Sequence, residues 1–474
     1  MNSPFDELKY KELLKGLEAS EILFSYVKTQ TDILRLDSFY YSKEFLSDEI
    51  IISKTTNKTL KELNASLLSF GAYSLNNFVE YKDSGIPFVR GLNMKNGVLD
   101  FSDTIYIDAN AHKLLWKSEV KPNTILLSMS GTIGEVAIAV QEYQYPMNSN
   151  QDIAKIRLKR ESIRPCYLYA FLRSKYGQNF LKREARGSVQ QHVFLSQIET
   201  IRIPLLPDSF QLQIEQLVKS AHSNLYQSKA LYSDAENMLL SEIGLQDWQP
   251  NNNPVNIKQL KESFWASGRL DAEYYQTKYD EIESVITKYK YGYDRIENLF
   301  SQNTEVCDYK EEAYNYIEIG DINIGDGSAN YNLVSTENLP DNAKRVLHKN
   351  DILVSKVRPY RGAVSIIDFD DEKLIGSGAF TVLHEKTSYK KEVLQILLRT
   401  QIYKDWLLKW NVGSSYPVIK DEDIMNLPIP LFPNTVQTKI AEYVQKSIFL
   451  RNEAKHLLEE AKMMVEKEIE EGTF

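Results

Sequence analysis

Polar loops with side chains that suit nucleic-acid binding recur in two parts of this 474-residue chain. Arg pairs with guanine, Asn or Gln pairs with adenine, and Ser, Lys and backbone amides bind phosphate. The candidates in the first part are Arg90, Asn93, Lys95, Ser128, Ser130, Thr132, Asn150, Gln151, Arg186, Ser188, Gln190, Gln191 and His192. Those in the second part are Lys344, Arg345, Lys356, Arg358, Tyr360, Arg361, Ser377, Ser414, Ser415 and Tyr416. One such loop is also typical of an ordinary surface turn, but recurrence at equivalent positions favours a binding role.

The sequence signatures of catalysis are missing. The chain has no G-x-x-x-x-G-K-[ST] loop, no G-x-G-x-x-G, no H-E-x-x-H, no G-x-S-x-G and no (D/N)PP(Y/F) element of adenine methyltransferases. Glu119-Val120-Lys121, with Asp103 or Asp108 upstream, looks like a nuclease triplet. Such triplets arise often by chance in a chain rich in Glu and Lys, and the six histidines show no ligand spacing. We therefore expect a chain that is not an enzyme and that binds no metal or cofactor itself.

Charge is segregated along the chain. The formal net charge is −9, yet basic residues concentrate in 155–186 and 344–361, whereas the C-terminal tail is rich in Glu. Local basic faces on an acidic chain are typical of a protein that contacts an anion in two places, and also of solvated surfaces. Cys166 and Cys307 lie far apart without a CxxC motif, which indicates a reducing compartment. With no signal-like or membrane-spanning run, we expect a soluble, cytoplasmic protein.

Two long helices must position these loops. The segment 201–218 closes a strand with two prolines, and Ser209 stands at the N-cap position of a helix that runs to about residue 245. The segment 427–444 repeats this construction and opens a helix to about residue 471. The predicted apolar stripes are Ile214, Leu217, Ala221, Leu225, Leu231, Ala235 and Met238 in the first helix, and Ile440, Val444, Ser447, Arg451, Ala454, Leu458, Ala461, Val465 and Glu468 in the second.

The repeat extends beyond the helices at offsets of about 226 to 234 residues. RLDSFYY (35–41) matches RLDAEYY (269–275), NTILLSMSG (123–131) matches NDILVSKVR (350–358), and the amphipathic segments 166–174 and 392–400 align. The stretches 42–122 and 276–349 show little match. A chain that repeats itself in this way consists of two copies of one unit. Because short strands alternate with polar loops and helices, the fold class is mixed α/β (α+β).

The predicted domains follow the chain order. Residues 1–208 form a first recognition domain and 209–250 a first spacer helix and linker. Residues 251–434 form a second recognition domain and 435–474 a second spacer helix. The two copies share their matching segments but differ in the stretches 42–122 and 276–349, which suggests that each domain recognises something different.

This order of motifs resembles the DNA-specificity subunit of type I restriction–modification enzymes. The matching residues are Arg35-Leu36-Asp37 with Tyr40-Tyr41, Arg269-Leu270-Asp271 with Tyr274-Tyr275, Ser128–Gly134, Asn150-Gln151-Asp152, Gly187-Ser188 and both I-P-L-x-P helices. The resemblance covers nearly the whole chain. It departs at 357–361, where VRPYR replaces the Gly-rich loop of the first copy.

The resemblance implies two target-recognition domains that each read one half of a split double-stranded DNA site. It implies that the two long helices pack as an antiparallel coiled coil, and that the partners are two methyltransferase subunits, which bind S-adenosylmethionine, and a restriction/translocase subunit. A helix of roughly 33 residues spans about 50 Å, and one DNA turn is about 34–36 Å, so such a spacer suits half-sites about one turn apart. Two alternatives remain at this point: a coiled-coil assembly protein that reads no DNA, and a specificity chain of a non-standard methyltransferase–nuclease system.

Overall fold

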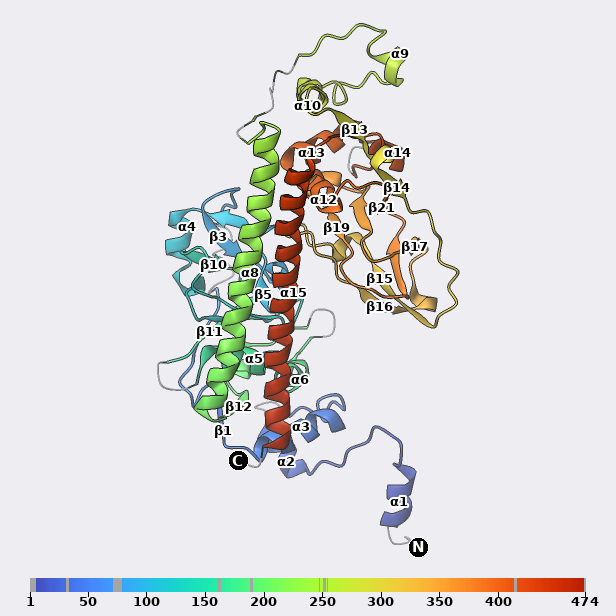
Figure 1. The fold of residues 1–474 in the computed structure, drawn as a ribbon. Helices are drawn as coiled ribbons and strands as arrows, with labels where there is room; N and C mark the ends of the chain where they lie inside the picture. Colours follow the sequence, from blue (N-terminus) through green and yellow to red (C-terminus); the bar gives the residue numbers. More distant parts are fainter. Residues whose placement is uncertain are drawn as a thin grey trace. The chain divides into compact units, whose positions relative to one another are not determined.

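The computed structural model describes residues 6–30, 34–70, 79–159, 163–187, 191–246, 248–249, 253, 255–412 and 416–472. Packing divides the chain into two compact units (Figure 1). Unit 1 consists of residues 1–224 and 453–474, and unit 2 of residues 225–452. Among the described residues, no helix is long and apolar enough to cross a membrane. The boundaries between the two units, at residues 224/225 and 452/453, lie within the two long helices. The domain boundaries expected from the sequence describe the order of modules along the chain, and they stay a prediction.

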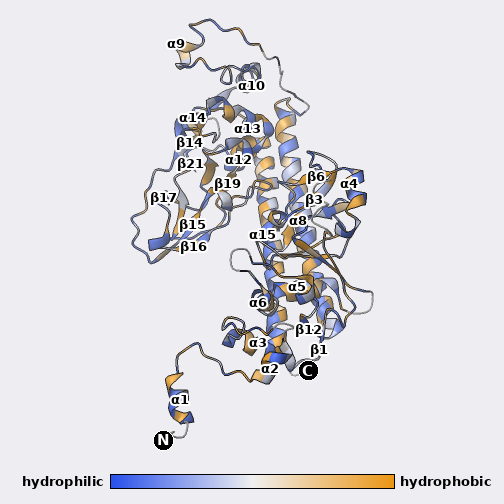
Figure 2. Ribbon diagram, turned by 180° about the vertical axis from the view of Figure 1, so that it is seen from behind, coloured by the Kyte–Doolittle hydropathy of each residue, from blue (hydrophilic) through white to orange (hydrophobic). Residues whose placement is uncertain are grey.

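The two long helices are α8 (Asp208–Glu242) and α15 (Asn434–Glu471). They confirm the two predicted long helices, and their role as spacers stays a prediction. Helix α8 begins one residue earlier than expected, so Ser209 lies in its first turn, and Asp208 forms an ion pair with Arg164 at 2.9 Å. Figure 2 shows apolar and polar residues alternating along both helices.

Both helices carry one seven-residue pattern in the same register. The buried positions of α15 include Ile440, Val444, Ser447, Ala454, Leu458, Ala461 and Val465, as predicted. The predicted Arg451 is only half-buried, and Ile469 is buried in place of the predicted Glu468. The buried positions of α8 include Ile214, Val218, Ala221, Ser228, Ala235 and Leu239. The predicted Leu217, Leu225, Leu231 and Met238 are only half-buried. Leu217 and Met238 each lie next to a buried apolar residue, because neighbouring apolar residues in a heptad cannot be told apart by spacing alone.

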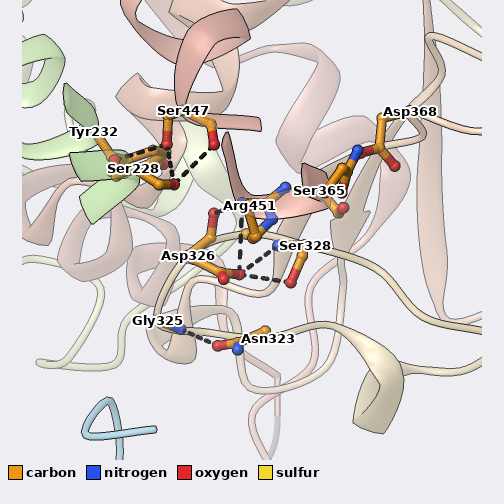
Figure 3. Close-up of polar contacts among 12 residues, drawn as sticks. Ser228, Tyr232, Asn323, Gly325, Asp326, Ser328, Ser365, Asp368, Ser447 and Arg451 are labelled. Carbon is orange, nitrogen blue, oxygen red and sulfur yellow. Dashed lines mark hydrogen bonds and ion pairs between the residues drawn. The ribbon is translucent and has the colours of Figure 1, made fainter. Parts of the chain in front are cut away.

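Within unit 2 the two helices run antiparallel. Ser228 Oγ donates to the carbonyl of Ser447 at 2.8 Å, and Ser447 Oγ donates to the carbonyl of Ser228 at 2.8 Å (Figure 3). Further along, Leu239 of α8 and Ile440 of α15 share one apolar core. Small side chains at the contact let the two backbones approach closely enough for these reciprocal hydrogen bonds.

Unit 1 holds two four-stranded sheets. The first has the order β6-β3-β10-β7, with β6 (Ile105–Ile107), β3 (Ile86–Val89), β10 (Met147–Ser149) and β7 (Glu119–Val120). The second has the order β2-β11-β8-β9, with β2 (Ser66–Leu68), β11 (Ile153–Arg157), β8 (Ile125–Ser128) and β9 (Val136–Ile138). A short pair joins β1 (Asn57–Thr59) to β12 (Arg202–Pro204), and a hairpin joins β4 (Met94–Lys95) to β5 (Val98–Leu99).

Unit 2 repeats the topology of the two four-stranded sheets strand for strand, and an isolated bridge between Ile322 and Ala329 stands in place of the β4–β5 hairpin. Its sheets are β16-β15-β20-β17, with β16 (Asn332–Ser335), β15 (Ala313–Ile317), β20 (Leu374–Ser377) and β17 (Ala343–Val346), and β14-β21-β18-β19, with β14 (Phe300–Gln302), β21 (Phe380–Glu385), β18 (Ile352–Ser355) and β19 (Val364–Ile366). The pair β13 (Tyr293–Arg295) and β22 (Pro428–Pro430) corresponds to β1 and β12. The unlike stretches 42–122 and 276–349 thus adopt the same strand order, a likeness that their sequences do not reveal.

Helices complete each unit. Those of unit 1, besides α8 and α15, are α1 (Glu7–Leu13), α2 (Phe24–Gln30), α3 (Lys43–Ser53), α4 (Ala109–Leu114), α5 (Pro165–Arg173), α6 (Lys175–Glu184) and α7 (Leu195–Ile198). Those of unit 2 are α9 (Phe264–Ser267), α10 (Thr277–Thr287), α11 (Ile296–Leu299), α12 (Lys391–Arg399), α13 (Gln401–Leu407) and α14 (Asp421–Met425). Helices α5 and α12 confirm the amphipathic helices that the sequence predicted.

The repeated Arg-Leu-Asp motif has a structural role in both units. Arg35 pairs with Asp37 at 2.8 Å and donates to the carbonyl of Arg183 at 3.0 Å. Arg269 pairs with Asp271 and donates to the carbonyl of Asn411 at 3.2 Å. Each motif therefore fastens the start of its module to a later segment, which is the last turn of α6 in unit 1 and the residue Asn411 after α13 in unit 2.

Candidate nucleic-acid interface

Four loops that are distant in the sequence meet at one place in unit 1. The Met129 amide donates to the carbonyl of Asp152 at 2.7 Å, and the Val193 amide donates to the carbonyl of Met129 at 2.9 Å. The Asn150 amide donates to the carbonyl of Val89 at 2.8 Å, which brings in the loop that starts at Arg90. Backbone hydrogen bonds thus gather the predicted loops 90–95, 128–132, 150–152 and 186–192.

Unit 2 gathers its loops with the same bonds. The Lys356 amide donates to the carbonyl of Ala379 at 2.9 Å, and the Ile419 amide donates to the carbonyl of Lys356 at 3.0 Å. The bridge between Val357 and Val418 corresponds to the bridge between Ser130 and His192 in unit 1. We call each set of bonded loops the loop frame of its unit. Three loops of the unit 1 frame follow the strands β3, β8 and β10, whereas the loop 186–192 follows helix α6.

The loop frame of unit 1 contains side chains that hold the loops and others that face solvent. Ser128 is buried and donates to the carbonyl of Ser130 at 3.1 Å. Asn93 is buried, accepts from the Arg90 amide at 3.0 Å and donates to the carbonyl of Asp100 at 3.1 Å. These two side chains shape the turns. Thr132 and Gln191 are exposed.

Three buried polar atoms in the same loop frame have no hydrogen-bond partner among the described residues. They are Nε of Arg90, Oδ1 of Asn150 and Nε of Arg186. The amide nitrogen of Asn150 is held by Asp152 at 3.1 Å, so its orientation is fixed. One open acceptor and two open donors in these neighbouring loops suit an incoming polar group, because a buried polar group without a partner is costly.

The loop frame of unit 2 carries charge where that of unit 1 is apolar. Lys356 pairs with Asp421 at 3.1 Å, and Thr381 donates to Asp421 at 2.6 Å. Although burial raises it, the hydrogen bonds from Thr381 and Lys356 hold the pKa of Asp421 below its usual range. The repeat equivalents in unit 1 are Met129, Leu195 and Ala154.

Arg358 occupies a strained position in unit 2. Its φ is +50°, in the left-handed region, and its guanidinium lies 4.2 Å from the centre of the Tyr416 ring, which is 58% exposed. The equivalent residue of unit 1 is Gly131, with φ +73°. An arginine kept where the backbone favours glycine costs energy, and such strain is retained at functional positions.

The predicted site residues differ in exposure. The exposed residues are Lys95, Thr132, Gln191, Lys344, Tyr360, Arg361 and Tyr416. The half-buried residues are Arg90, Ser130, Asn150, Gln151, Arg186, His192, Arg345, Lys356 and Arg358, and the buried residues are Asn93, Ser128 and Ser377. Ser188, Gln190, Ser414 and Ser415 lie outside the described residues.

The sequence-based selection missed the residues that support these loops. Asp152 and Asp421 hold Asn150 and Lys356, respectively. In unit 1, Tyr169 donates to the carbonyl of Gly97 at 3.0 Å, which fixes the β4–β5 hairpin on α5. The Asn96-Gly97 pair, both with positive φ, is the usual signal of a two-residue hairpin and could have located this turn.

The described residues contain no cluster of three or more His, Cys, Asp or Glu side chains placed to hold a metal ion. What the loop frames present instead is hydroxyl, amide, guanidinium, ammonium and aromatic groups. These groups form hydrogen bonds, neutralise anions and stack on planar rings.

Two tandem α/β modules, each with one loop frame and each ending in a long helix, define a class of paired recognition proteins. A family model described as type I restriction modification DNA specificity domain matches residues 52–223 and 295–460. The chain belongs to this family, as the resemblance predicted.

The chain is also similar to known proteins. The chain is 23% identical over 414 residues to the type I restriction enzyme MjaVIII specificity subunit of Methanocaldococcus jannaschii, covering 82% of this chain and 89% of that protein. The crystal structure of the type I restriction–modification S subunit from M. genitalium is similar at 14% identity, with a TM-score of 0.40, covering 88% of this chain and 95% of that chain. The HsdS subunit from Thermoanaerobacter tengcongensis is similar at 12% identity, with a TM-score of 0.27 and coverage of 86% and 97%.

Proposed function

We propose that this chain is the sequence-reading subunit of a type I restriction–modification complex, in which each unit reads one half of a bipartite, asymmetric double-stranded DNA site. The main support is the loop frame, which recurs in both units with the same backbone hydrogen bonds and different side chains. Equal frames with different contents are what two readers of two different half-sites require. Base edges in the major groove are distinguished by such side chains, whereas phosphates are not.

The proposal assigns no chemistry to this chain itself. The partners are two methyltransferase subunits, which carry S-adenosylmethionine and flip an adenine of each half-site out of the stack, and a restriction/translocase subunit. The long helices with their heptad pattern suit a scaffold on which such partners assemble. Lys and Arg of the loop frames would contact phosphates, so DNA binding should weaken steeply with salt.

Selection from random duplexes tests this function. We expect the assembled complex to enrich one split motif, and we expect the same motif to carry methylated adenines in the host genome. Exchange of residues 42–200 for those of another family member should change the first half-site alone. Failure to enrich any split motif would favour a coiled-coil assembly protein, and a motif that changes in both halves would contradict independent reading.

A further inference from the structure

Arg358 stands where two loops of the unit 2 loop frame meet. Its amide donates to the carbonyl of Pro417 at 2.8 Å, and its carbonyl accepts from the amide of Arg361 at 2.9 Å. The bridge between Val357 and Val418 joins the same two loops beside it. These bonds fix the backbone of Arg358, so its side chain starts from a defined position on the loop frame.

The backbone conformation at Arg358 is unfavourable for this residue for two separate reasons. Its φ of +50° and ψ of +54° lie in the left-handed region, which disfavours every residue with a bulky side chain. The next residue is Pro359, whose ring favours an extended conformation in the residue before it. Unit 1 has Gly131 followed by Thr132 at the equivalent positions and avoids both costs. The turn itself does not require an arginine, so the role of Arg358 lies in its side chain.

The guanidinium of Arg358 is held on an aromatic face. It lies 4.2 Å from the centre of the Tyr416 ring, and Tyr416 is 58% exposed. Tyr416 is itself restricted by the proline that follows it, and this Pro417 accepts the Arg358 amide. A guanidinium stacks on a tyrosine ring through cation–π attraction. The contact therefore fixes the plane of the guanidinium at the surface of the loop frame.

The N–H groups of this guanidinium have no partner within the part of the chain that the structure describes. Other half-buried arginines of unit 2 donate to protein groups: Arg399 donates to the carbonyls of Gly362 and Ile324, and Arg269 pairs with Asp271. The nitrogens of Arg358 are accessible to solvent, unlike the buried open donors in the loop frame of unit 1. A guanidinium can only donate, so the group that completes this site is an external acceptor.

A guanidinium in a fixed plane favours two acceptors that lie side by side in one plane. In the major groove guanine presents N7 and O6 in this way. Adenine presents one acceptor beside an amino donor, cytosine presents an amino donor, and thymine presents one acceptor beside a methyl group. A phosphate accepts from a cation in many orientations and carries no sequence information, so a phosphate contact does not explain why the plane is fixed.

We propose that Arg358, held by Tyr416, reads one guanine of the half-site that unit 2 recognises, by donating to N7 and O6 of that base in the major groove. This assignment rests on the proposed function. It makes Arg358 a specificity-determining residue and Tyr416 a positioning residue. Unit 1 has no side chain beyond hydrogen at Gly131, so the first half-site lacks this contact.

Duplexes with single 7-deazaguanine replacements test the assignment once selection has defined the split motif. The replacement exchanges N7 for carbon and removes one of the two acceptors. We expect the replacement of one guanine in the second half-site to weaken binding of the unaltered, assembled complex about tenfold, within the range for a bidentate base contact. Arg358→Gly, which copies unit 1, should bind the natural and the replaced duplex equally. Fluorescence anisotropy measures each affinity, and Arg295→Ala, at an arginine 57% exposed outside the loop frame, is the control and should keep the full tenfold loss.

Two substitutions of Tyr416 test its positioning role. Tyr416→Ala keeps the arginine but removes the ring, and it should reduce the loss caused by 7-deazaguanine to about threefold, since an exposed cation–π contact contributes a few-fold in affinity. Tyr416→Phe keeps the aromatic face and should restore the full loss. Equal losses in the two Tyr416 variants would overturn the positioning role of the ring.

The outcomes separate this assignment from the proposed function. A split motif without a guanine in the second half-site would overturn the assignment and leave the proposed function standing. An equal effect of 7-deazaguanine on the unaltered and Arg358→Gly complexes would do the same. A complex that enriches no split motif would overturn the proposed function and the assignment with it.

Discussion

Unit 1 and unit 2 share a backbone and differ in what the backbone holds. The sheet orders, the paired strands at the module ends and the loop-frame hydrogen bonds are the same. The side chains differ at the centre of the sheet and in the loop frame. Lys155 of β11 corresponds to Val382 of β21, and Gly131 corresponds to Arg358. The comparison teaches that backbone bonding fixes this module, while its side chains are free to specialise.

The buried lysine gives the largest expected effect. Lys155 is 0% exposed, and its Nζ donates to Ser149 Oγ at 2.9 Å. Burial, with Arg157 nearby, lowers the pKa of Lys155 to about 7. Replacing it with the residue of unit 2, as Lys155→Val, should stabilise unit 1 at pH 7 by roughly 2–5 kcal/mol. Val382→Lys should destabilise unit 2 by a similar amount. Hydrogen exchange of β11 and β21 amides measures both.

The same lysine makes unit 1 depend on pH. Because its pKa is lower in the folded chain than in the unfolded chain, folding releases a proton between about pH 7 and the ordinary lysine range near 10.4. The free energy of unfolding of unit 1 should therefore rise with pH across this window and be unaffected by this group below it. The Lys155→Val variant should lack this rise. A parallel profile in both proteins would contradict the assignment.

Arg358 sharpens the comparison of the loop frames. Arg358→Gly installs the residue that unit 1 has at this left-handed position, so unit 2 should keep or slightly gain stability. If the guanidinium reads a base, affinity should fall by about 1–3 kcal/mol, and discrimination should relax in the second half-site only. Filter binding of the assembled complex to duplexes varied in each half measures this. Lys344→Ala serves as the control for an exposed cation, and equal losses for both variants would indicate a phosphate contact.

The helix contact gives the smallest effect. Ser447→Ala removes one of two reciprocal hydrogen bonds in unit 2 and should cost about 1 kcal/mol. The double variant Ser228→Ala with Ser447→Ala should be close to neutral, because the repeat equivalents of Ser447 and Ser228 are Ala221 and Ala454, both fully buried. Urea unfolding followed by the fluorescence of Trp406 and Trp410 reports on unit 2. Additive losses in the double variant would show that the two serines act separately.

Much of the frame was predictable from the sequence. Apolar stripes located both long helices, and the offsets of about 226 to 234 residues between matching segments revealed the repeat. The likeness of 42–122 and 276–349 was not predictable, because short strands of three or four residues carry too little pattern to align. The phase of the α8 stripe was missed where adjacent positions are both apolar.

The candidate site was predictable in location and not in detail. Gathering of the loops at strand ends follows from the repeat, but the burial of Asn93, Ser128 and Ser377 does not, because short polar side chains serve turns and ligands equally well. The open acceptor of Asn150 depends on its hydrogen bond to Asp152, two residues away in sequence but fixed by tertiary packing. The exposed fraction of a polar side chain in the folded chain shows whether it shapes a turn or faces a ligand, and the amino-acid composition of a loop does not show this.

The reciprocal hydrogen bonds between Ser228 and Ser447 also fix the register of α15 along α8. Sliding α15 by one heptad would keep most apolar side chains matched, since the buried positions of both helices repeat every seven residues. It would, however, set Ser228 against Ile440 or an alanine and leave buried hydroxyls unpaired, at a cost of about 1–3 kcal/mol for each unsatisfied group. Hydrophobic packing alone permits several registers of the two helices, and one pair of serine hydroxyls selects one of these registers.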